Sequence, residues 1–124
     1  MSIHPTKRCD MELFEERIDT INYLLNQNKI SEAFDEYRTL VLMVNRLYID
    51  RFDILKKTKH LGDHIFLKIL KEKIKDPIRI KEAIDLRSKI EEGKFNEILK
   101  QHHQICELIN QENFLDALKK FKKC

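Results

Sequence analysis

The sequence has very little glycine, proline or valine. Its 124 residues include two glycines, two prolines and two valines, and they include no tryptophan. A β-sandwich or β-barrel needs many turns and many β-branched residues, which these counts cannot supply. Leucine, isoleucine, lysine and glutamate dominate instead, and they favour helix over strand. The composition therefore predicts an all-α protein.

Two further absences narrow the class of protein. The chain has no apolar run of the roughly 18 residues that a membrane span requires, and residues 1–9 lack the apolar stretch of a signal peptide. The three cysteines, Cys9, Cys106 and Cys124, are an odd and sparse set, which fits reduced thiols better than a disulfide scaffold. We therefore expect a soluble cytoplasmic protein with no membrane contact, in which residues 1–9 are a polar tail and residues 10–124 form one domain.

Apolar side chains recur at intervals of three and four residues along most of the chain. Phe95, Ile98, His102, Ile105 and Ile109 show this spacing clearly, and on a helix it places all five on one stripe. The pattern predicts an antiparallel bundle of five or six helices built from helical hairpins. The expected core consists of Phe14, Ile18, Ile21, Phe34, Tyr37, Val41, Val44, Phe66, Ile69, Phe95, Ile98, Ile105, Ile109 and Leu118.

Capping and breaking residues predict the helix boundaries. Aspartate and serine are good N-caps, proline fits the first helical turn, and glycine ends helices or breaks them. On this basis we expect a first helix from Asp10, a second from Ser31 to about Lys57, a break over Lys56–Asp63 at Gly62, a third helix through Ile74, a fourth from Asp76 and Pro77 to Gly93, a fifth over Phe95–Ile109 and a sixth over Phe114–Phe121.

One hairpin pattern occurs twice. Residues Leu24–Phe34 are matched 84 positions later by Leu108–Leu118, and Glu92–Leu99 is a looser third copy. Each copy reads as a helix end, a turn, an apolar residue, an acid and a new helix, and helices joined this closely lie antiparallel. Recurrent capping chemistry and a true repeat ancestry both explain the match. The copies are too irregular for a solenoid array.

The stretch His102–Leu118 resembles the end of the FCD domain, the all-helical effector domain of a subfamily of GntR-type transcription regulators. His102 and Ala117 fall at matching positions, and the family's final histidine falls on Cys124. The resemblance implies a helical domain that senses a ligand or a metal and is linked to transcription regulation. Only nine residues precede the first expected helix, too few for the family's winged helix, so we expect a stand-alone sensor domain.

A second segment, 28–36, resembles the stretch before the same family's Asp-x3-His pair. The two positions of that pair fall on Arg38 and Leu42 in one register and on His60 and His64 in another. The two registers are incompatible, so the resemblance covers only about the last 25 residues.

A metal site is the sharpest chemical hypothesis. His60 and His64 are four residues apart and share a face if they lie on a helix, a common spacing for ligands. His102 lies on the inward stripe of the fifth expected helix, and Cys124 is a soft ligand that completes the set. Zinc accepts such a mixture of nitrogen and sulfur ligands. The alternative for His102 is a core histidine held by hydrogen bonds.

The sequence contains no recognisable catalytic motif. The serines have no glycine-rich elbow around them, and no glycine-rich loop is present to hold a phosphate. Cys106 has no base near it in sequence and is expected to be a small packing residue. We therefore expect no enzymatic activity and no cofactor, with a divalent transition metal such as zinc as the alternative.

Charge is distributed in blocks along the chain. Residues 10–50 hold nine acids against four bases, residues 51–81 hold ten bases against four acids, and residues 82–118 hold eight acids against four bases. A positive block of this kind indicates a solvated face, a contact with the acidic blocks of another copy, or a surface for the phosphates of nucleic acid. The basic surface is expected to include Lys56, Lys57, Lys59, Lys68, Lys71, Lys75, Arg79 and Lys81.

Packed hairpins without catalytic motifs favour a non-enzymatic helical module. We expect it to be regulatory, to mediate protein–protein contacts and to form a homodimer through its second helix. The first alternative is the stand-alone FCD-like domain that senses a ligand or a metal. The second is an accessory protein that binds nucleic acid through the basic block 51–81.

Overall fold

The computed structural model describes residues 4–47, 49, 51–87 and 95–123. Within these residues the chain forms six α-helices and no strand, which confirms the predicted all-α bundle. The helices are α1 (His4–Asn26), α2 (Ile30–Arg46), α3 (Phe52–Lys73), α4 (Pro77–Arg87), α5 (Phe95–Asn110) and α6 (Phe114–Lys123).

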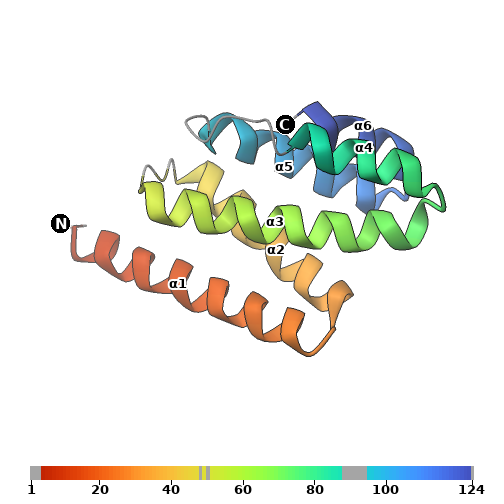
Figure 1. The fold of residues 1–124 in the computed structure, drawn as a ribbon. Coiled ribbons are helices and arrows are strands. Elements are labelled where there is room, and N and C mark those ends of the chain that lie inside the picture. Colours follow the sequence, from red (N-terminus) through yellow and green to blue (C-terminus); the bar gives the residue numbers. More distant parts are fainter. Residues whose placement is uncertain (1–3, 48, 50, 88–94, 124) are drawn as a thin grey trace.

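The two central helices are α2 and α3. In Figure 1 they lie between α1 on one side and α4, α5 and α6 on the other. The helix α2 packs against α1, α3 and α5, while α4 packs mainly on α6 and touches α3 only slightly. As a result, α4 is covered by fewer neighbours than α2 or α3.

The core prediction is confirmed at nearly every position. All the predicted core residues are buried except Ile69, which is partly buried at the edge of the core. Burial of an apolar side chain of this size stabilises the fold by about 1.5–3 kcal/mol relative to leaving it in water. The spacing of three and four residues therefore identifies most of the residues that hold the bundle together.

The two copies of the hairpin pattern fold into the same turn. Asn28 has φ 57° and Glu112, 84 residues later, has φ 61°. The N–H of the following residue then donates to a carbonyl five residues back, Lys29 to Leu24 at 2.9 Å and Asn113 to Leu108 at 2.8 Å. This is the Schellman arrangement, in which a left-handed residue ends one helix and turns the chain into the next. The antiparallel hairpins predicted from the sequence are confirmed, and residues 92–94, the turn of the third copy, lie outside the described residues.

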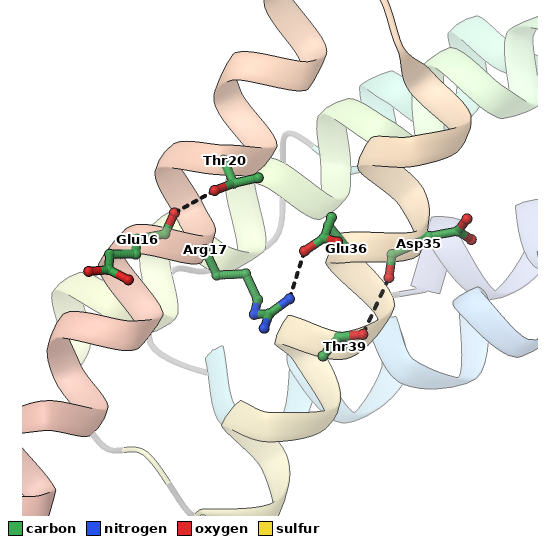
Figure 2. A network of polar contacts seen from close by, with 6 residues as sticks. All are labelled: Glu16, Arg17, Thr20, Asp35, Glu36 and Thr39. Carbon is green, nitrogen blue, oxygen red and sulfur yellow. Dashed lines mark hydrogen bonds and ion pairs between the residues drawn. The ribbon is translucent and has the colours of Figure 1, made fainter.

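The first hairpin is also linked across its outer side. Arg17 Nη1 on α1 is 2.6 Å from Glu36 Oε1 on α2 (Figure 2). The Thr20 and Thr39 hydroxyls beside this pair donate to carbonyls of their own helices and do not cross between them. Because both charged side chains are partly exposed, the ion pair is worth no more than about 1 kcal/mol. The core contacts, not this pair, hold α1 on α2.

The predicted start of the first helix and the predicted end of the second are wrong. The first helix begins at His4 and not at Asp10, so the expected polar tail is helical from residue 4 onward, and Pro5 lies in its first turn, where proline is tolerated. The second helix begins at Ile30, within one residue of the prediction, but its N-cap is Lys29 and not Ser31. It ends at Arg46 and not near Lys57, because the chain turns to bury Ile49, whose N–H donates to the carbonyl of Val44.

The predicted start of the fourth helix is confirmed. Asp76 Oδ1 accepts a hydrogen bond from the N–H of Arg79 at 3.2 Å, so Asp76 caps the helix that Pro77 opens. The predicted end of that helix at Gly93 lies outside the described residues.

Candidate functional site

Gly62 lies in the middle of α3 and does not break it. The expected break over Lys56–Asp63 is wrong, because α3 is continuous from Phe52 to Lys73. A methyl group added at Gly62 would overlap Tyr37 Oη and His102 Nδ1. Glycine inside a helix costs about 1 kcal/mol relative to alanine, so this glycine serves the close approach of α2 and α5 and not helix termination.

A buried polar cluster fills the space beside Gly62. The Tyr37 hydroxyl, from α2, lies 2.7 Å from His102 Nδ1 on α5, and both side chains are fully buried. On the other side of the imidazole, Nε2 lies 3.4 Å from Asp63 Oδ1 on α3. The neutral tautomer with its proton on Nε2 fits both contacts, because it accepts from Tyr37 and directs its N–H toward the carboxylate. His102 is therefore held between three helices.

Asp63 connects this cluster to the protein surface. Its Oδ2 accepts a hydrogen bond from Lys59 Nζ at 2.8 Å, one turn earlier on α3. A histidine between a hydroxyl and a carboxylate has the residue types of a proton-transfer site. A substrate, however, would have to part α2, α3 and α5 to reach the imidazole of His102, because that side chain has no exposed surface.

Aromatic rings also pack against the imidazole. The centroid of the Phe66 ring lies 5.0 Å from that of His102 and 5.7 Å from that of Tyr37, in edge-to-face arrangements. Phe121 packs edge-to-face on Phe66 at 6.2 Å. Such pairs add about 0.5–1.5 kcal/mol to the burial of the rings. His102 is thus a core histidine held by its hydrogen bond to Tyr37, which agrees with the alternative expected from its place on the inward stripe.

His60 and His64 lie on the opposite face of α3 from Gly62. At about 100° per residue, Gly62 points roughly 180° away from the midpoint of the two histidines. Both histidines are exposed and line a cavity of about 420 Å³ between α1 and α3, together with Asp19 and Lys57. The expectation that the two histidines share a helix face is confirmed.

Of the four predicted metal ligands, the structure describes three, and it does not bring His102 together with His60 and His64. His102 lies on the Gly62 side of α3, away from His60 and His64, and Cys124 lies outside the described residues. Among the residues that the structure describes, no three His, Cys, Asp or Glu side chains form a group that could hold a metal ion. The predicted set therefore divides into an exposed pair and a core histidine.

Cys106 lies one helical turn after His102 and is fully buried. Burial raises the pKa of its thiol above the ordinary value, an effect that the charge of Arg38 opposes. Only the thiolate is nucleophilic, so a thiol that stays protonated is inert. Cys106 is a packing residue in this structure, as the sequence indicates.

Part of the predicted basic surface forms a stripe along α3. Lys57, Lys68 and Lys71 are exposed, and their spacing places them on the same face as His60 and His64. The stripe from residue 57 to residue 71 extends about 21 Å at 1.5 Å per residue. The negative charge of Asp19, on α1, lies near the Lys57 end of this stripe, where both residues line the same cavity.

The other predicted basic residues have different surroundings. Lys59 bonds to Asp63, Arg79 lies 3.8 Å from Asp76, and Lys56 is partly buried. Lys71, Lys75 and Lys81 line a second cavity, between the end of α3 and α4. The predicted basic residues therefore do not form one surface. Those of the α3 stripe and of this second cavity are open to solvent.

Apolar side chains are exposed on α4. Ile78, Ile84 and Leu86 are 79%, 37% and 40% exposed, while Ile80 and Ala83 of the same helix are buried. These exposed side chains were not predicted from the sequence, and neither were Tyr37 and Asp63 as partners of His102. For Ile78 a signal was available, because an isoleucine two residues before Ile80 points away from the inward stripe of its helix.

No helix in the described part of the chain is long and apolar enough to span a membrane. We found no match to the chain among protein-family models, curated proteins or solved structures. The resemblance of His102–Leu118 to the FCD domain therefore stays a prediction.

Proposed function

We propose that this chain is a non-enzymatic helical interaction module whose partner-binding face is α4 with the adjoining end of α3. The observation that carries the proposal is the exposure of Ile78, Ile84 and Leu86 on one 11-residue helix. Apolar surface in water is unfavourable, and these three side chains are exposed around much of one short helix, which favours α4 as the element where another protein binds.

The buried polar cluster supports the non-enzymatic part of the proposal. Tyr37, His102 and Asp63 have residue types used in catalysis, but the imidazole is enclosed by packed helices and aromatic rings. A buried polar network of this kind favours one arrangement of a core. The burial of Tyr37 and His102 therefore favours a structural role for this cluster in the proposed non-enzymatic module.

The experiment places a photo-crosslinking amino acid at position 78 of the full chain in cells, and at exposed position 100 on α5 as the control. The proposal predicts a discrete protein adduct at position 78 that is missing at position 100. The captured protein is then purified, and its affinity for the wild-type chain and for Ile78→Glu is measured by calorimetry.

Ile78→Glu is expected to weaken that complex about tenfold or more, since a charge at an apolar contact must be desolvated. The melting temperature should be unchanged, because Ile78 is 79% exposed and contributes little to the core. The proposal is wrong if positions 78 and 100 give the same adducts, or if the captured protein binds both chains equally.

Self-association through α2 is the form of interaction that the sequence favours. In the structure the apolar stripe of α2 packs against α1, α3 and α5 of the same chain. We therefore propose that any homodimer uses the α4 face, and Ile78→Glu should then convert a dimer to a monomer. Size-exclusion chromatography with light scattering measures this directly, and a wild-type chain that is strictly monomeric at all concentrations removes self-association from the proposal.

A second candidate is binding of nucleic acid by the α3 stripe. The observation that favours it is the run of Lys57, His60, His64, Lys68 and Lys71 along one face. Lysine contacts to phosphates give affinity that falls steeply with salt. Retardation of DNA or RNA that weakens with salt and is lost in Lys68→Glu with Lys71→Glu supports this candidate. Retardation that those changes leave intact contradicts it.

A further inference from the structure

The end of α3 and the start of α4 enclose a groove of about 490 Å³. Ile74 and Ile80 form its buried floor, and Pro77 and the partly exposed Ile84 continue the apolar lining along α4. We call this the α3–α4 groove. Its volume is within the range of natural binding sites, and its apolar lining is typical of them.

Lysine side chains surround this apolar floor. Lys71 and Lys75 stand on the α3 side and Lys81 on the α4 side, and all three are exposed. Among the described residues of the lining, the carboxylate is that of Asp76, which already caps α4 and lies 3.8 Å from Arg79. The rim of the α3–α4 groove is therefore positive, with apolar lysine stems below charged ends.

The spacing of the apolar lining matches one side of a helix. Pro77, Ile80 and Ile84 are three and four residues apart, so they extend for two turns of α4, or about 10 Å. A docked helix places two or three apolar anchors, at positions i, i+3 or i+4, and i+7, into a groove of this length.

We propose that the α3–α4 groove binds an acidic amphipathic helix of a partner protein, with its apolar anchors on Ile74, Ile80 and Ile84 and its carboxylates beside the three lysines. This inference rests on the proposed function and names the class of partner. Charge complementarity of this type increases association rates and excludes basic competitors. Nucleic acid fits less well, because the described residues that line the groove include no aromatic side chain to stack on a base.

The test measures binding of a labelled peptide of about 16 residues to the full chain by fluorescence anisotropy. The peptide carries leucines at i, i+3, i+4 and i+7 and glutamates on both flanks. One control peptide has the same composition in shuffled order, and the other has lysines in place of the glutamates. We expect the acidic amphipathic peptide to bind at least about tenfold more tightly than either control, and its binding to weaken with salt.

Three variants locate the binding site. Lys71→Glu with Lys75→Glu is expected to weaken binding about tenfold, and Ile84→Asp to weaken it similarly. The matched control is Lys29→Glu with Lys100→Glu, which makes the same change in net charge at exposed sites outside the groove and should bind as the wild type. Circular dichroism verifies that each variant retains the helical fold.

Several results would overturn the inference. One is equal binding of the shuffled peptide, and another is equal loss of binding in the Lys29→Glu with Lys100→Glu control. Displacement of the peptide by an oligonucleotide would assign the rim to nucleic acid, and a dimer dissolved by Ile84→Asp would assign the groove to a second copy. If the acidic amphipathic peptide does not bind but the complex crosslinked at position 78 is still found, the proposed function stands. Only the inference that the partner presents an acidic helix is then rejected.

Discussion

Gly62 is a residue at which the packing of neighbouring helices outweighs helix propensity. Alanine is the better helix former by about 1 kcal/mol. We nevertheless expect Gly62→Ala to destabilise the protein by about 1–3 kcal/mol, because its methyl group would overlap Tyr37 Oη and His102 Nδ1. Urea unfolding followed by circular dichroism measures the change.

Tyr37→Phe provides the control for this prediction. It removes the hydroxyl oxygen that the new methyl group would overlap, at the cost of the hydrogen bond to His102. The double variant Gly62→Ala with Tyr37→Phe should therefore be more stable than the sum of the two single changes predicts. Additive effects, or a gain of stability in Gly62→Ala alone, would contradict this explanation of the glycine.

The thiol of Cys106 is expected to be unreactive in the native protein. Its side chain is buried and its pKa is raised, so it is protonated at pH 8, where an ordinary thiol is partly ionised. In a chain with Cys9→Ser and Cys124→Ser, a thiol reagent should label Cys106 at least about a hundredfold more slowly in the folded state than in urea. Equal rates in the two states would show that α5 does not stay packed around this residue.

At this scale the sequence predicted which side chains are buried better than it predicted what they touch. The inward position of His102 follows from its spacing with Ile98 and Ile105. Its contact with Tyr37 does not, because 65 residues separate the two in sequence. Gly62 was misread for the same reason, since the atoms that require a glycine there belong to other helices.

Among the elements, the two matching turns differ in one useful way. Asparagine tolerates the left-handed conformation that Asn28 adopts. At the equivalent position, Glu112 adopts it at a steric cost of about 1 kcal/mol. We expect Glu112→Gly to raise the stability by a few tenths to about 1 kcal/mol and Asn28→Gly to change it less. Thermal unfolding of both variants measures this.

Glu112→Ala is the matched control, since it removes the same side chain but keeps a Cβ atom. It should give none of the gain that glycine gives. A Glu112→Gly protein that melts below the wild type would mean that the carboxylate, and not the backbone conformation, matters at this turn.

The start of α3 gives a pH-dependent prediction. Hydrogen bonds from Arg51, at 3.0 and 2.7 Å, hold the pKa of Asp53 below its ordinary value. A lowered folded-state pKa contributes stability that is present above the unfolded pKa of about 3.9 and is lost as the pH falls through the folded value. Arg51→Gln should therefore raise the pKa of Asp53, as followed by NMR titration. An Asp53 that titrates at the same pH in both chains would contradict the pairing.

Element boundaries were predictable where a local signal decides them. Asp76 and Pro77 open α4 as expected, and the stripe from Phe95 to Ile109 is one helix. The end of α2 was not predictable, because its apolar pattern continues beyond Arg46. There the chain turns for a tertiary reason, the burial of Ile49.

For the whole molecule, the periodic pattern predicts a bundle but not its open surfaces. The spacing of apolar residues indicates which face of each helix is buried, so the core can be predicted from the sequence. The α3–α4 groove depends instead on a contact that is nearly missing, since α4 packs on α6 and only slightly on α3. Lys71, Lys75 and Lys81 were recognised as basic, but their place around an apolar floor required the arrangement of the helices.

Amide hydrogen exchange of the full chain, with and without the acidic amphipathic peptide, tests the central claim most directly. Slower exchange is predicted for backbone amides within residues 71–84, with no change at the turn 27–29 between α1 and α2. Unchanged exchange over 71–84 at saturating peptide, or slowing confined to residues 57–64, would contradict a docking surface between α3 and α4.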